Sequence, residues 1–145
     1  HNEVVGLNNR MTDIHAASGR VQRTKVDGWT KTRQQNATFL SENLEGVVTP
    51  PVADGAVHVY HQYTIRVADD RDGLAKALKD EYKVGSCMFY HVPNHRLKPF
   101  ARDIHLANTE QAAQEALSLP VHPSLSQGDL ERVVEAVNAL VKAGA

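Results

Sequence analysis

The stretch Val57-His58-Val59-Tyr60-His61-Gln62-Tyr63-Thr64-Ile65-Arg66-Val67 carries the clearest strand pattern in this chain of 145 residues. Apolar side chains occupy most of the odd-numbered positions, and polar side chains occupy most of the even-numbered ones. Because successive side chains of a strand point to opposite faces, this alternation predicts a strand with one buried face. The breaker-rich residues 50–55 precede it, and residues 69–72 predict a turn and a helix start after it.

Before this strand, the spacing of apolar residues predicts two helices separated by a kink. Thr12 is suited to cap the first helix, which Gly28 is expected to interrupt. A second stripe at steps of three or four residues runs from Trp29 to Leu44, and Gly46 is expected to end that helix. These residues predict a long helical arm rather than a compact unit.

After the strand, short strands and helices alternate. The apolar run at 84–89 predicts a strand in the centre of the sheet, and residues 119–121 predict another brief strand. Thr109 is expected to cap a short helix, and Ser126 with Asp129 resembles a capping box before the last helix. This order predicts an α+β fold, in which a small sheet has helices on one side.

Composition excludes several classes of function. The formal net charge is −1, with 16 basic and 17 acidic residues, so neither nucleic acid nor an anionic membrane is expected as a partner. No apolar run approaches the roughly 20 residues that a membrane span needs. A single cysteine forms no internal disulfide, which favours a reducing, cytoplasmic location.

Neither the histidines nor the cysteine predicts a metal or nucleophilic site. His58 and His61 lie three apart in a strand and point to opposite faces, while a proline separates His91 from His95. We therefore expect no metal site. Cys87 lies in an apolar predicted strand, where a buried and unreactive thiol is expected.

The segment 6–13 concentrates polar chemistry beside a predicted helix start. Asn8, Asn9 and Arg10 follow Gly6 and directly precede the helix. Amide and guanidinium donors at a helix N-terminus suit a phosphate or carboxylate group. The alternative is an Asx-type turn with a surface salt bridge.

A second polar segment, Tyr90-His91-Val92-Pro93-Asn94-His95-Arg96, lies in a predicted loop that prolines stiffen. Loops of this kind at a sheet edge often face a ligand. A plain surface crossover is the alternative.

Four motifs, in order along nearly the whole chain, resemble the DegT/DnrJ/EryC1/StrS family of sugar aminotransferases, which depend on pyridoxal 5'-phosphate. They are Gly6-x-Asn8-x-Arg10-Met11-Thr12-Asp13 with Ala16-Ala17 and Gln22, the strand segment 58–63 with Arg71-Asp72, the loop 90–95, and Leu117-Ser118-Leu119-Pro120-Val121-His122-Pro123.

The resemblance implies a fold-type I transferase of which this chain is the C-terminal part. Residues 1–46 would be the arm that joins an absent large domain, and residues 47–145 the small domain with a small antiparallel sheet. The lysine that binds the cofactor belongs to the large domain, and none of the seven lysines here matches its motif. The chain is therefore expected to supply no catalytic residue and to be inactive alone.

The resemblance also implies roles for four residues. Asn8 matches the asparagine that reaches the cofactor phosphate of the neighbouring subunit of a homodimer, and Arg10 matches the arginine that supports this turn. Tyr90 and His95 match the tyrosine and histidine of the substrate loop. Asn94 departs from the leucine that the family has in that loop.

For the parent protein, the resemblance implies amino transfer, from glutamate as donor, to a keto sugar that is usually linked to a nucleotide. One alternative is a sugar dehydratase of the same family, which has a histidine in place of the lysine. The other is an interaction domain without catalysis that keeps this fold.

Overall fold

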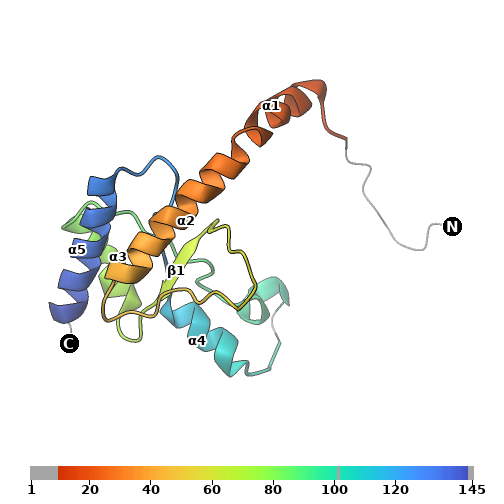
Figure 1. Ribbon diagram of the computed structural model, residues 1–145. Helices are drawn as coiled ribbons and strands as arrows, with labels where there is room; N and C mark the ends of the chain where they lie inside the picture. Colours follow the sequence, from red (N-terminus) through yellow and green to blue (C-terminus); the bar gives the residue numbers. More distant parts are fainter. Residues whose placement is uncertain (1–9, 101, 144–145) are drawn as a thin grey trace.

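The computed structural model describes residues 10–100 and 102–143. Helices, two short strands and the loops between them make up this part of the chain, and Figure 1 shows one helical arm that extends from a body built around the strands. In chain order, the elements are α1 (Asp13–Arg23), α2 (Val26–Asn43), β1 (Tyr63–Arg66), α3 (Arg71–Asp80), the 3-10 helices η1 (Asn94–Arg96) and η2 (Lys98–Phe100), α4 (Ala107–Glu115), β2 (Ala116–Leu119) and α5 (Gln127–Ala143). The predicted α+β class is confirmed.

The arm begins where the sequence predicts and kinks earlier than predicted. The hydroxyl of Thr12 accepts a hydrogen bond from the His15 N–H at 3.3 Å, which confirms Thr12 as the N-cap of α1. The break lies at residues 24–25, where the N–H of Lys25 turns back to the carbonyl of Gln22. The prediction that Gly28 interrupts the helix is wrong, because a glycine inside a helix costs only about 1 kcal/mol and α2 continues through it.

Only the second half of the arm is anchored in the body. Ala37, Leu40 and Leu44 are buried in the core, whereas α1 has no buried residue. The side-chain amide of Asn138 on α5 donates to the Asn43 carbonyl and accepts from the Glu45 N–H, so it satisfies backbone groups at the end of α2.

The two strands form an antiparallel ribbon whose core face is fully covered. Tyr63 pairs with Leu119 and Ile65 with Leu117, and all four side chains are buried with residues of α2, α3 and α5. The Tyr63 hydroxyl lies 2.8 Å from the hydroxyl of Ser41 on α2, and burial raises the pKa of the Tyr63 phenol. On the other face, the hydroxyls of Thr64 and Ser118 lie 2.7 Å apart.

The strand predicted over 57–67 is much shorter in the structure. Only residues 63–66 pair with another strand, and Tyr60 has φ 47°, which interrupts the extended backbone before them. Val57 is 80% exposed and Val59 51% exposed, so the apolar face predicted there is not buried. Alternation alone does not make a strand where no neighbour supplies hydrogen bonds.

The segment predicted as a central strand, residues 84–89, lies at the edge of the ribbon instead. It makes a single antiparallel bridge, between Cys87 and Ser118, while Val48 makes the matching bridge to Arg66 on the other edge. Cys87 is exposed, so the prediction of a buried thiol is wrong. An edge position leaves one side of the segment without a neighbour to cover it.

In the last third of the chain, two predicted boundaries shift and one is confirmed. Helix α4 begins at Ala107, before Thr109, and leads directly into β2, which covers 116–119 rather than 119–121. Before α5, the Ser126 hydroxyl accepts from the Asp129 N–H and the Asp129 carboxylate accepts from the Ser126 N–H, which confirms the capping box.

Two arginines hold the junction of α4 and β2 in place. The buried Arg71, at the start of α3, donates from Nη1 to the carbonyls of Ala113 and Ala116 at 3.1 and 2.9 Å. The half-exposed Arg66 on β1 pairs with the carboxylate of Glu115. The junction is thus tied to α3 by a buried guanidinium and to β1 by a surface ion pair.

The two arginines are expected to differ in their effect on stability. We expect Arg71→Ala to lower the free energy of unfolding by about 2–4 kcal/mol, because it leaves two carbonyls without their charged donor. Arg66→Ala, the matched control, should cost less than about 1 kcal/mol, since its ion pair is exposed. Urea denaturation measures both, and equal losses would contradict the role given to Arg71.

Candidate functional site

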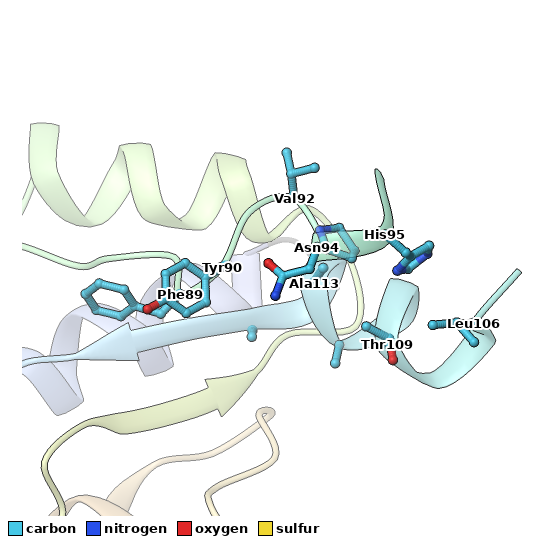
Figure 2. Close-up of a pocket in the computed structure, with 11 residues that line it drawn as sticks. Phe89, Tyr90, Val92, Asn94, His95, Leu106, Thr109 and Ala113 are labelled. Atoms are coloured by element: carbon cyan, nitrogen blue, oxygen red, sulfur yellow. The ribbon is translucent and has the colours of Figure 1, made fainter. Parts of the chain in front are cut away.

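A cavity of about 460 Å³ lies between α4 and the segment that contains the predicted ligand loop (Figure 2). Apolar side chains provide most of its wall, and Tyr90, Asn94, His95 and Thr109 contribute polar groups. The lining residues are Phe89, Tyr90, Val92, Pro93, Asn94, His95, Leu106, Thr109, Ala112, Ala113 and Ala116.

The cavity exists because small side chains of α4 face a stiff loop. Ala112 and Ala113 on α4 and Ala116 at the start of β2 leave room on this side of the cavity, near the junction that Arg71 fixes. The loop continues from the edge segment at Cys87, which is bonded to β2. Both walls of the cavity are therefore attached to the same strand.

His95 is the buried polar residue of the loop. It lies in η1, is only 9% exposed, and its Nε2 is 2.9 Å from Oε1 of Glu110 on α4. Its carbonyl accepts a hydrogen bond from the Arg102 N–H at 3.0 Å. The side chain and the backbone of His95 are thus both fixed.

The carboxylate of Glu110 is the centre of a hydrogen-bonded cluster. Besides His95, Oε1 accepts from Nη2 of Arg96 at 2.8 Å and from the Leu106 N–H at 3.2 Å, and Oε2 lies 3.1 Å from Nδ1 of His105. The hydrogen bond from His95, followed by that from Leu106, lowers the pKa of Glu110 to about 2. Glu110 is therefore an ionised acceptor at any physiological pH.

The structure brings two of the four predicted site residues together. Tyr90 and His95 line the same cavity, and Figure 2 shows Asn94 between them. They differ in environment, since Tyr90 is 79% exposed and His95 is buried. Arg10 is exposed and lies two residues before Thr12, the N-cap of α1, and Figure 1 shows α1 at the far end of the arm from the body. Asn8 lies outside the described residues.

Sequence reasoning missed Glu110 and Thr109. A glutamate in the first turn of a helix is usually explained by the favourable interaction of its charge with the helix dipole. The sequence therefore does not indicate that Glu110 contacts a loop outside α4. Thr109 was expected to be an N-cap, but it lies inside α4 and lines the cavity. Only the packing of the loop on α4 reveals these roles.

Outside the Glu110 cluster, the histidines and the cysteine among the described residues form no comparable cluster. Within residues 10–100 and 102–143, no three His, Cys, Asp or Glu side chains are grouped so that they could hold a metal ion. Arg33, His61, Cys87 and His122 help to line a shallower hollow of about 410 Å³. None of the described helices has the length and apolar character needed to cross a membrane.

Comparison with known families agrees with the arrangement of these motifs. The model of the DegT/DnrJ/EryC1/StrS aminotransferase family matches residues 1–138. The chain belongs to this family. The match includes the arm, the ribbon, the cavity loop and most of α5.

Individual relatives match nearly the whole chain. A pleiotropic regulatory protein of Geobacillus stearothermophilus is 37% identical over 94% of the chain. A dTDP-3-amino-3,4,6-trideoxy-alpha-D-glucose transaminase of Micromonospora megalomicea subsp. nigra is 32% identical, also over 94%. The structure of S. venezuelae DesV in complex with a ketimine intermediate has a TM-score of 0.86 and 30% identity over 98% of the chain.

The chain spans about two fifths of the length of these family members. The matched share is 39% of the Geobacillus protein, 39% of the Micromonospora transaminase and 40% of DesV. The fold that the resemblance implied, a small antiparallel sheet with flanking helices and a long kinked arm, is therefore a part of the family's structure.

The low pKa of Glu110 predicts how the stability of the fold depends on pH. The pKa is about 2 in the folded chain and close to the ordinary 4.5 in the unfolded chain, so the ionised carboxylate stabilises the fold above pH 4.5. This contribution is lost as the pH falls from 4.5 toward 2. We expect Glu110→Gln to destabilise the chain at about pH 6 and to have a smaller effect at about pH 3.

Urea denaturation of both proteins at the two pH values measures this change. His95, Arg96 and His105 are the side chains that face this carboxylate. An effect of the same size at both pH values would contradict the depressed pKa.

Proposed function

We propose that this chain is the C-terminal part of an aminotransferase that uses pyridoxal 5'-phosphate to move an amino group from glutamate to a keto sugar, usually nucleotide-linked. Residues 1–46 would form the arm and residues 47–145 the small domain. The observation that carries the proposal is the family match over residues 1–138, together with a cavity lined by Tyr90 and His95. The Micromonospora relative, a transaminase named for a dTDP-linked sugar, supports the substrate class.

Under this proposal, the arm serves the cofactor of a neighbouring subunit in a homodimer. Asn8 would reach the phosphate group and Arg10 would support the turn beside it, where a guanidinium is well matched to an anion. The exposed guanidinium of Arg10 fits this role, since it lies beside the N-terminus of α1, where an anion is favoured. When bound, the cofactor would store the amino group between the two halves of the reaction.

Exposed apolar side chains on the arm support the same arrangement. Met11 is 71% exposed, Ile14 79% and Val21 56%. Such a surface is suited to packing against another chain or domain. A subunit contact through α1 would bring the start of the arm to the partner's site.

Tyr90 and His95 are proposed to contact the sugar. Both line the cavity, one as an exposed phenol and the other as a fixed imidazole. A fixed polar group discriminates between ligands because one left unpaired in a closed site costs about 1–3 kcal/mol.

Two alternative functions differ from amino transfer in what they require of the complete protein. A dehydratase of the same family would have histidine in place of the cofactor lysine, so the residue at that position in the large domain decides between the two reactions. A non-catalytic interaction domain is favoured by the name of the Geobacillus relative, which describes a regulatory protein. Coding sequence that continues upstream into a large domain would argue against this third function.

The proposed reaction is tested in the complete protein that contains this chain, loaded with pyridoxal 5'-phosphate. We expect L-glutamate to remove the visible absorption of the bound cofactor and to release 2-oxoglutarate. Asn8→Ala should raise the dissociation constant of the cofactor about tenfold, the equivalent of ~1.4 kcal/mol. Gln35→Ala, which removes an exposed amide farther along the arm, is the control and should leave it unchanged.

Absence of 2-oxoglutarate release, with the cofactor bound, would exclude transamination from glutamate. Equal cofactor affinity in the Asn8 variant and the control would remove Asn8 from the site. Because both measurements concern the cofactor, they do not depend on knowing the sugar.

The proposed position of the cofactor lysine in the large domain gives a further prediction. The 145-residue chain alone, mixed with pyridoxal 5'-phosphate and borohydride, should retain no stoichiometric covalent adduct, because the proposed lysine lies in the large domain. Mass spectrometry of the chain and of the complete protein measures the adduct. Stoichiometric labelling of one of the chain's own lysines would overturn this assignment.

A further inference from the structure

We propose that Glu110 is a positioning residue that fixes the His95 imidazole as its Nε2–H tautomer, so that the ring offers Nδ1 as a hydrogen-bond acceptor to a ligand hydroxyl. The inference deepens the proposed function and rests on it for one point, that His95 contacts the sugar. The assignment of the tautomer rests on geometry alone.

The first step is the direction of the hydrogen bond. Nε2 of His95 lies 2.9 Å from Oε1 of Glu110, and an ionised carboxylate only accepts hydrogen bonds. Nε2 must therefore carry the proton. A neutral imidazole has one N–H, so Nδ1 is then unprotonated and is an acceptor.

The second step is that the carboxylate itself cannot reorient. Oε1 is also held by Arg96 and by the N–H of Leu106 at the N-cap of α4. Rotation of the Glu110 side chain would break contacts with two segments of the chain at once. The proton on His95 is consequently directed toward an acceptor that stays in place.

The third step is the position of His95 at the cavity. The residue is 9% exposed and lines the cavity wall beside Asn94 and Thr109. Among the described residues, none forms a hydrogen bond with its Nδ1. The available nitrogen therefore differs from the one that anchors the ring.

His105 provides an internal comparison. It contacts the same carboxylate through Nδ1 rather than Nε2, and its side chain is 72% exposed. Because the carboxylate only accepts, this contact requires the Nδ1–H tautomer of His105. Water competes for the hydrogen bonds of this exposed ring. We expect His105 to be a mixture of tautomers and His95 to be predominantly one.

The assignment is tested by NMR on the full 145-residue chain labelled with ¹⁵N-histidine. Long-range ¹H–¹⁵N correlations distinguish the tautomers, and the spectra are recorded at about pH 8.5, well above the ordinary pKa of an imidazole. A His95→Gln variant identifies the signals of residue 95. The expected pattern is that of a protonated Nε2 and an unprotonated Nδ1.

Glu110→Gln keeps the size of the side chain and replaces the carboxylate by an amide that either donates or accepts. We expect this variant to lower the ratio of Nε2–H to Nδ1–H at His95 about tenfold, since it loses a charge-assisted bond. The control is Glu115→Gln on the same helix, whose carboxylate contacts Arg66 and Gln111 rather than a histidine. It should leave the ratio unchanged.

A protonated Nδ1 in the wild-type chain would overturn the proposal, even if the Glu110 variant failed to fold. An unchanged tautomer ratio in a folded Glu110→Gln variant would overturn it as well. Neither outcome depends on cofactor binding or amino transfer, so failure of this inference and failure of the proposed function are separate results.

Discussion

Burial of one face of a two-stranded ribbon is the constraint on which the rest of this structure depends. An isolated pair of strands is at best marginally stable in water, so β1 and β2 need cover for the side chains of Tyr63, Ile65, Leu117 and Leu119. Helices α2, α3 and α5 provide it, with residues that are themselves almost fully buried. The part of the arm before the middle of α2 lies outside this core, and α1 contributes no buried residue.

The candidate site is built outward from the same ribbon. Helix α4 runs into β2 without a connecting loop, so the pairing of β2 with β1 also places α4. The Arg71 guanidinium secures that junction, and the Glu110 carboxylate then fixes the loop that contains His95. The loop is thereby held by hydrogen bonds to an ionised carboxylate, which are stronger than neutral ones.

The sequence predicts two of the helix caps correctly and predicts strand pairing poorly. The N-cap at Thr12 and the capping box at Ser126 and Asp129 are formed as predicted, because these contacts join residues three apart in the chain. The strand predicted over 57–67 pairs only at 63–66, and the segment at 84–89 lies at an edge. Strand pairing depends on partners far away in the sequence, which alternation of residues does not specify.

The sequence by itself determined the α+β class, the helical arm, the family resemblance and the choice of Tyr90 and His95, since these follow from periodicity and from ordered motifs. Only the tertiary structure decided that Tyr90 and His95 share a cavity and that Glu110 holds His95. It also decided that Cys87 is exposed. The physical reason is that these properties arise where segments distant in the chain meet, and there burial and hydrogen-bond partners come from the packed neighbours.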